Sequence, residues 1–492
     1  MKIQTLAALL TASALLAPAA HSVELIAIGS VSGSYEDFAT ETAFPLENGT
    51  PGNLLGGIGS GLAYAGGSTF LALPDRGPNA APYNSSVDDT VSYIPRFHTF
   101  NLSLAPNTDP LSGLPFTLTP MLVETTLLSS GSPLAYGNGA GLGTQIDGVT
   151  PLGAGAPALN AIDHTHYFTG RSDNFSATLP STNPSNARLD PEAIRVSNNG
   201  RSVFISDEYG PYVHEFNRVT GKRVRSFKLP ANLAITTLSP QKDVEIGSNP
   251  VGRVTNKGME GLAITPDGKL LVGIMQANLE QDKKKSLRIV TIETGSGATH
   301  EYAYQLTVGS GVSEIVAVNN HQFLVDERDG SGMADTPLLT DPASAADVKK
   351  LFLIDLAGAT DITAIAGPNA NLSAYAVAKT EFLDIVAKLN AAGVDSYLIP
   401  SKIEGLAFGQ DVVIDGVTKH TLYVSNDNDF LATIADPFKL PGDATRGMIA
   451  NPNQFYVFAF TESELPGFMP QNFKYGSRDS DAAHRGHDAE SH

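Results

Sequence analysis

Residues 190–216 read DPEAIRVSNNGRSVFISDEYGPYVHEF and predict two β-strands joined by a tight turn. Asn198, Asn199 and Gly200 tolerate the positive φ angles that hairpin turns require. The β-branched and aromatic run after the turn is typical of a strand. If the chain folds back here, Glu192 faces Asp207 or lies within one position of it. Two like charges facing each other across a hairpin destabilise it by about 0.2–1 kcal/mol, so a cation is expected nearby.

The same arrangement recurs along the chain. Full copies begin at Glu260 (EGLAITPDGKLLVGIMQ), Glu314 (EIVAVNNHQFLVDERDG) and Glu404 (EGLAFGQD, followed by HTLYVSNDNDF), and a divergent copy begins at Ser60 (SGLAYAGGSTFLALPDRGPN). Each copy has the length of one four-stranded sheet with variable loops. Such repeats indicate a β-propeller. We therefore predict an all-β chain, a propeller of about six blades of four antiparallel strands with loop insertions and a minor helix.

The remaining segments fit into this plan. VELIAIGSV (23–31) is expected either to close the ring by pairing with FYVFAF (455–460) or to be a free edge strand. Residues 129–189 are rich in Gly, Pro, Ser and Asn, and are either an insertion or a sixth blade without a readable signal; assembly of that blade from both termini is the other possibility. Residues 374–392 have helical spacing and predict a helix between blades. Residues 477–492 are polar and predict a disordered tail, so one domain over 23–476 is expected.

Composition limits the partners. The chain has 492 residues, 47 glycines and 31 prolines, which suits a turn-rich β protein. Its net charge of −19 argues against nucleic acid and anionic membrane surfaces, and it is compatible with bound divalent cations. Cysteine is absent, which excludes disulfides and thiolate metal sites.

The first residues predict export. Lys2 and the apolar run LAALLTASALLAPAA predict a signal peptide over residues 1–22. The run is shorter than the roughly 20 residues that a membrane span needs. We expect an exported monomer, periplasmic or extracellular, without a membrane span.

Propeller geometry predicts where the repeated acids meet. The first strand of each blade lines the central channel, and its start lies at the same end as the end of the second strand. Carboxylates from both strands should therefore gather at one mouth of the channel. The members are Glu192, Glu260, Glu314, Glu404, Asp75, Asp207, Asp326 and Asp427. Glu314 should face Asp326, whereas Glu260 should face the neutral Gln276.

Six ordered blocks resemble the esterase-like phytase-type family of exported bacterial proteins. They are PDRGPN (74–79), PRFHTFNL (95–102), DPEAI with SDEYGPYVHEF (190–216), NKGMEGLAITPDG (256–268), SEIVAV with LVDERD (313–329) and KIEGLAF with SNDNDF (402–430). The resemblance implies a phytase-like propeller that hydrolyses carboxyl esters or phosphoesters. It transfers no catalytic mechanism residue by residue.

The first hypothesis is a metal-assisted ester hydrolase. Calcium takes six to eight oxygen ligands, and no organic cofactor is expected. We predict metal ligation by Asp207, Glu260, Asp326, Glu404, Asp427 and Asp429. We predict catalytic roles for Glu192, Glu314, Arg328 and Arg76, and binding of a small ester or phosphoester substrate by Lys257 and Lys402. Salt bridges between blades are the structural alternative for the same side chains.

Two further hypotheses stay open. A serine esterase finds little support, because the chain has no G-x-S-x-G elbow. The single His-x-His, His164 and His166, could suit zinc but has no obvious third ligand. A non-catalytic, calcium-stabilised propeller that serves as a binding platform would show the same repeats.

Overall fold

A computed structural model describes residues 23–474, except 80–81, 109–112, 138–141 and 366–369. The expected signal peptide and the expected C-terminal tail, residues 477–492, both lie outside the described residues. Within them the chain forms an all-β propeller of five blades, so the prediction of six is wrong. The innermost strands β2, β8, β12, β16 and β20 contact one another in that order, and β20 returns to β2 to close the ring.

Each blade has four antiparallel strands, which follow one another from the channel outward. Blade I consists of β2 (Gly61–Tyr64), β3 (Thr69–Leu73), β4 (Arg96–Pro106) and β5 (Phe116–Leu127), and blade II of β8 (Pro191–Val196), β9 (Ser202–Asp207), β10 (Tyr212–Asn217) and β11 (Lys222–Lys228). Blade III consists of β12 (Met259–Ile264), β13 (Leu270–Met275), β14 (Ser286–Glu293) and β15 (Thr299–Gln305), and blade IV of β16 (Gly311–Ala317), β17 (Gln322–Arg328), β18 (Lys349–Asp355) and β19 (Lys379–Asp384). Blade V consists of β20 (Ile403–Phe408), β22 (Val417–Asn426), β25 (Asn453–Phe460) and β1 (Glu24–Val31).

The two ends of the described chain close the ring together. β1 pairs antiparallel with β25, from Glu24 opposite Ala459 to Val31 opposite Asn453. This confirms the predicted closure and excludes a free edge strand at β1. Blade V is therefore the blade assembled from both ends of the chain, and it already carries the readable repeat at Glu404.

The irregular segment 129–189 extends blade II and forms no blade. Its strand β6 (Ser129–Ser130) pairs in parallel with β11, and β7 (His166–Tyr167) pairs with β6. The short helix α1 (Leu159–Asp163) precedes β7. The short strand β21 (Val412–Ile414) pairs with β22 of blade V. Outside the blades lie α2 (Lys242–Ser248), the two-stranded sheet of β23 (Thr433–Ala435) and β24 (Met448–Ala450), and four 3-10 turns, Thr40–Thr42, Ala231–Leu233, Leu372–Tyr375 and Ser396–Leu398.

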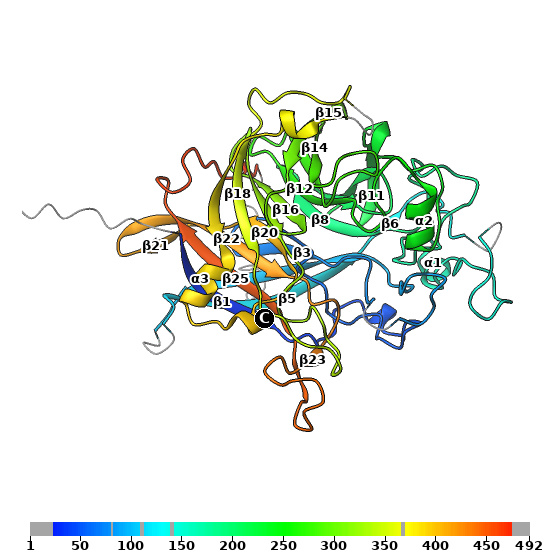
Figure 1. The fold of residues 1–492 in the computed structure, drawn as a ribbon, viewed down its shortest axis with the longest axis horizontal. Helices are drawn as coiled ribbons and strands as arrows, with labels where there is room; N and C mark the ends of the chain where they lie inside the picture. Colours follow the sequence, from blue (N-terminus) through cyan, green and yellow to red (C-terminus); the bar gives the residue numbers. More distant parts are fainter. Residues whose placement is uncertain (1–22, 80–81, 109–112, 138–141, 366–369, 475–492) are drawn as a thin grey trace, which may run out of the picture.

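The helix predicted over 374–392 is only half correct. The segment begins at the end of the 3-10 turn Leu372–Tyr375 and continues as the outer strand β19, which pairs with β18. Its α-helical part is α3 (Ile385–Ala391). The side chain of Asp384 accepts a hydrogen bond from the Ala387 N–H and starts the helix at that point. Helix α3 contacts β18 and β1, so it lies between blades IV and V as expected (Figure 1).

Aromatic and glycine residues hold neighbouring blades together. Between blades I and V the rings of Phe70 and Tyr423 are 4.4 Å apart between centroids. At the glycine positions near the start of the inner strands, the neighbouring strand lies too close for a side chain. A Cβ on Gly61 would lie 2.8 Å from the Glu192 carbonyl oxygen, and one on Gly261 would lie 2.7 Å from the Ile315 nitrogen. The glycine that follows the repeated acid or serine is therefore required by the close approach of neighbouring inner strands.

In the described part of the chain, no helix has both the length and the apolar content that crossing a bilayer requires.

Candidate active site

Irregular pairing at the start of the inner strands frees the repeated glutamates from the ladders. In β12 the pairing skips Glu260 and in β20 it skips Glu404, and a similar irregularity in β8 spans Glu192. Bulges of this kind re-aim a side chain and are common next to active sites. In β16, Glu314 pairs directly with Asp326, as the hairpin geometry predicts.

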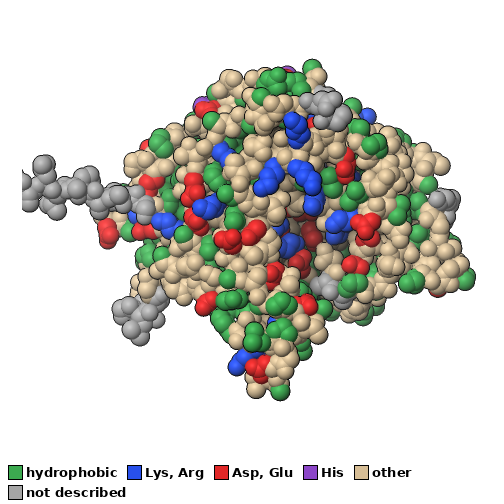
Figure 2. Space-filling view, viewed as in Figure 1, with side chains coloured by type: hydrophobic (Ala, Val, Ile, Leu, Met, Phe, Trp, Pro, Cys, Tyr) green, Lys and Arg blue, Asp and Glu red, His purple; other side chains and the backbone are tan. Residues whose placement is uncertain are grey.

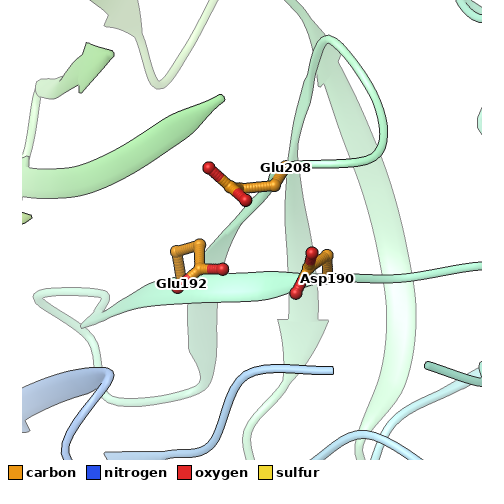
Figure 3. Close-up of side chains that lie close together, drawn as sticks. All are labelled: Asp190, Glu192 and Glu208. Atoms are coloured by element: carbon orange, nitrogen blue, oxygen red, sulfur yellow. The ribbon is translucent and has the colours of Figure 1, made fainter. Parts of the chain in front are cut away.

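Three carboxylates form a compact trio at the channel mouth: Asp190, Glu192 and Glu208. One oxygen of each lies within 4.8 Å of the others, and all three residues are buried. Figure 3 shows Asp190 and Glu192 at the start of β8 and Glu208 on the loop that follows β9. Among the described residues this is the only group of His, Asp and Glu side chains close enough together to hold a metal ion, so His164 and His166 form no such group.

The pKa values in this region are raised because carboxylates are buried next to one another. Burial, followed by the charge of Asp190, raises the pKa of Glu208 to about 7. Burial and the charge of Glu260 raise the pKa of Glu192 well above its usual value, and burial and Glu208 do the same to Glu260. A bound cation would offset this repulsion.

Protein cations already neutralise other predicted ligands. Lys402 forms an ion pair with Asp427, and its Nζ lies 2.9 Å from Asp429 Oδ1 and 3.9 Å from a Glu404 oxygen. Arg328 forms an ion pair with Glu404, and its Nη2 lies 3.8 Å from Glu260 Oε1. The structure therefore places these acids at the mouth, but beside basic side chains.

Arg76 adjoins the trio. Its Nη1 lies 2.8 Å from Asp190 Oδ2, and its backbone N–H donates to Asp190 Oδ1 at 3.2 Å. Glu260 accepts a hydrogen bond from the Gln276 amide at 2.7 Å, which agrees with the expected neutral partner.

A cavity of about 70 Å³ lies between these groups, enough for several waters or for an ion with waters. Its lining includes Asp75, Arg76, Glu192, Glu208, Glu260, Arg328, Lys402 and Glu404. A second, larger cleft of about 420 Å³ begins beside it. On the face viewed in Figure 2, acidic side chains in red and basic side chains in blue gather around a central hollow.

Six predicted site residues do not line the 70 Å³ cavity: Asp427 and Asp429, already described beside Lys402, and four others. Asp207 accepts hydrogen bonds from the backbone N–H groups of Asp190 and Tyr209 and is not among the residues that line the 70 Å³ cavity. Lys257 is exposed and does not line it either. Glu314 is buried against Arg195, 2.7 Å between Arg195 Nη2 and Glu314 Oε2, and burial raises its pKa to about 7. Asp326, opposite Glu314, is fully buried.

Comparisons with known proteins give one curated relative and several solved structures. The chain is 26% identical over 329 residues to a protein of Arthroderma benhamiae described as an uncharacterized secreted protein, a match that spans 57% of this chain and 60% of the relative. Among solved structures it matches the periplasmic gluconolactonase of Pseudomonas aeruginosa, at 10% identity and a TM-score of 0.31 over 89% of this chain and 99% of that one. A putative 6-phosphogluconolactonase of Bacteroides uniformis matches at 12% identity and a TM-score of 0.28 over 80% and 88%. At these scores neither structural likeness supports a conclusion about this chain.

The family comparison is extensive. The model of the phytase-like family, described as esterase-like activity of phytase, matches residues 53–430, which run from the loop before blade I into blade V. The ordered blocks from PDRGPN to SNDNDF fall inside that match. The chain therefore belongs to the phytase-like family.

Proposed function

We propose that this protein is an exported, cation-assisted hydrolase of ester bonds, with phosphoesters as the preferred class. The observation that carries the proposal is the buried trio of Asp190, Glu192 and Glu208 beside Arg76. Among the described residues, no Lys or Arg side chain forms an ion pair with Glu192 or Glu208. An unpaired buried carboxylate is costly, and a bound cation would remove that cost.

The donor set fits calcium. All three side chains offer hard carboxylate oxygens, and backbone carbonyls and waters supply the remaining ligands that calcium takes. Asp190, Glu192 and Glu208 would hold the ion, so Glu192 acts as a ligand in this proposal. When bound, the cation polarises the ester and lowers the pKa of a nearby water.

The residues of the chain supply the other parts of the reaction. Arg76 stabilises negative charge that develops on the group being transferred. Burial raises the pKa of Glu260, which suits this side chain to give a proton to the leaving oxygen. Arg328 and Gln276 keep the Glu260 carboxyl oriented toward the cavity.

Export and oligomeric state belong to the same proposal. The predicted signal peptide over residues 1–22 and the secreted relative support an exported protein. We propose a monomer that takes a small ester substrate at one channel mouth.

A binding platform without catalysis is the second candidate. The ion pairs that Arg328 and Lys402 make with Glu404 and Asp427 favour it, because they show acids of this mouth serving as links between chain segments. Such a platform would bind calcium and gain stability without turning over any ester.

The test is hydrolysis of phosphomonoesters, phosphodiesters and carboxyl esters with calcium and with chelator. We expect phosphoester hydrolysis with calcium, and a loss of at least about 100-fold in Glu192→Gln, because the metal contributes several kcal/mol to the transition state. Glu124→Gln, an exposed carboxylate on β5, is the matched control and should keep full activity. Calcium binding without turnover of any substrate would favour the platform.

A further inference from the structure

We propose that Arg76 forms a subsite for an oxyanion at the border between the 70 Å³ cavity and the larger cleft, and that Asn256 positions it. The subsite is defined by the geometry of the guanidinium and can be tested without turnover. Its assignment to the phosphate of a substrate rests on the proposed function.

One side of the Arg76 guanidinium is fixed. Nη1 lies 2.8 Å from Asp190 Oδ2 and also donates a hydrogen bond to the side-chain oxygen of Asn256. The side chain is only 12% exposed. Two acceptors on one nitrogen, from the start of blade II and from the loop before β12, hold the plane of the guanidinium in place.

The other edge is open. Arg76 Nε is buried and has no hydrogen-bond partner among the described residues. The hydrogen bonds that the Arg76 side chain donates to them come from Nη1. An unmet buried donor costs about 1–3 kcal/mol, which a ligand oxygen would recover. Nε and Nη2 point the same way and form the fork that binds phosphate or carboxylate through two parallel hydrogen bonds.

Arg328 in the same cavity provides the contrast. Its Nε donates to Ser313 Oγ, and its Nη2 donates to Glu404. The corresponding edge of Arg328 is therefore used within the protein. The open fork distinguishes Arg76 from this neighbour.

The position of Arg76 gives the subsite its role. Arg76 and Asn256 are the two residues that line both the 70 Å³ cavity and the 420 Å³ cleft. An anion on the open edge would lie at the border of the 70 Å³ cavity, which Glu192 and Glu208 of the trio also line. The group attached to it would extend into the cleft, which Asp89 and Lys242 also line.

Asn256 has a left-handed backbone conformation that few residue types tolerate. Its φ of 59° is in the left-handed region, which costs a non-glycine residue about 1–2 kcal/mol and which Asn tolerates better than most. The Lys257 N–H donates to the Val254 carbonyl and closes the turn that holds Asn256. The turn presents the amide oxygen to Arg76, so Asn256 is a positioning residue.

The experiment is calorimetric titration of the full mature chain with inorganic phosphate in the presence of chelator. We expect wild type to bind phosphate and Arg76→Gln to lose at least about tenfold in affinity, because a bidentate charged pair is removed. Arg76→Lys should weaken binding several-fold, since an ammonium cannot form the fork. Asn256→Gly keeps the left-handed backbone and removes only the amide, and it should weaken phosphate binding about three- to tenfold with little change in melting temperature.

The control is Arg225→Gln, which removes an arginine charge from the outer part of blade II and should leave phosphate binding unchanged. Unchanged binding in Arg76→Gln, or no binding by wild type at millimolar phosphate, would overturn the subsite. Tighter binding of acetate than of phosphate would support an anion subsite and contradict the preference for phosphoesters. Phosphate binding without hydrolysis of any ester would leave the subsite standing and refute the catalytic proposal alone.

Discussion

Asp326 is a buried carboxylate that has no hydrogen-bond partner in the described part of the chain. It is fully buried, and neither carboxylate oxygen accepts a hydrogen bond from a described residue. Burial raises its pKa to about 8, against the opposing charges of Arg328 and Lys349. The folded pKa of Asp326 lies above the unfolded value. The free energy of unfolding is therefore highest below about pH 4, where the carboxyl is protonated in both states, and it falls as pH rises to about 8.

We therefore expect Asp326→Asn to stabilise the calcium-free protein at pH 9, on the order of a few kcal/mol, and to change little at pH 5. The amide keeps the shape of the side chain and cannot ionise. Thermal unfolding at both pH values in chelator measures the effect, with the exposed Glu124→Gln as control. Equal losses of stability between pH 5 and pH 9 in variant and wild type would contradict the assignment.

At the residue scale, the repeat predicts where the acids lie better than what each one contacts. Hairpin geometry puts Glu314 opposite Asp326, and the structure has that pairing. It cannot decide which of the successive residues Asp207 and Glu208 turns into the channel, and Glu208 is the one that joins the trio. Asp190 could have been predicted, since it lies two residues before Glu192 and residues two apart share a face of a strand.

At the scale of elements, Arg195 on β8 ties the inner strands together across the channel. Its guanidinium donates to the carbonyl oxygens of Leu62 in blade I and Ile315 in blade IV, and it forms an ion pair with Glu314. Both partners of the pair are buried. Removing one partner of such a pair leaves an uncompensated buried charge, which typically costs about 3–5 kcal/mol.

We expect Arg195→Met to destabilise the protein by about that amount in guanidinium unfolding. Adding Glu314→Gln to it should restore at least half of the loss, because the double variant removes both buried charges of the pair. Glu314→Gln alone completes the cycle. If the losses in free energy of unfolding of the two single variants add up in the double variant, the ion pair does not couple β8 to β16.

At the same scale, the segment 374–392 shows that a local sequence pattern does not reveal which strand a segment will pair with. Residues 374–392 have the apolar spacing of one helix, but the first part pairs with β18 as β19, because blade IV needs an outer strand. Helical spacing depends only on neighbouring residues, whereas strand formation here depends on pairing with a strand of the same sheet. An arginine within the strand β8 likewise carries no sign of its distant partner Glu314.

At the scale of the molecule, the number of blades depends on how the chain ends are used. Five readable repeats give five blades. Among the described residues no sixth blade forms, because β6 and β7 extend blade II, β1 completes blade V, and the separate sheet of β23 and β24 has only two strands. The sequence shows the strand-forming residues of 23–31 plainly. It does not show that blade V would otherwise lack its outermost strand.

The end of the described chain crosses the channel mouth opposite the acidic one. The Met469 N–H donates to Val318 of blade IV, the Asn472 N–H to Pro266 of blade III and the Lys474 N–H to Asn198 of blade II. Val318, Pro266 and Asn198 follow the ends of their inner strands, whereas the trio lies at the starts. Residues 469–474 therefore form a strap over three blades, and the strap is remote from the proposed cation.

A chain that ends at Phe468 should consequently be less stable than one that ends at Lys474, by about 2–4 kcal/mol, since at least three hydrogen bonds between blades are lost at about 1 kcal/mol each. Calcium affinity should be equal in the two chains, because no residue of the strap lines the 70 Å³ cavity. Thermal unfolding and calorimetric titration with calcium separate the two effects. A drop in calcium affinity that exceeds the loss of folded protein would mean that the far mouth controls the shape of the acidic one, and that the two ends of the channel do not act independently.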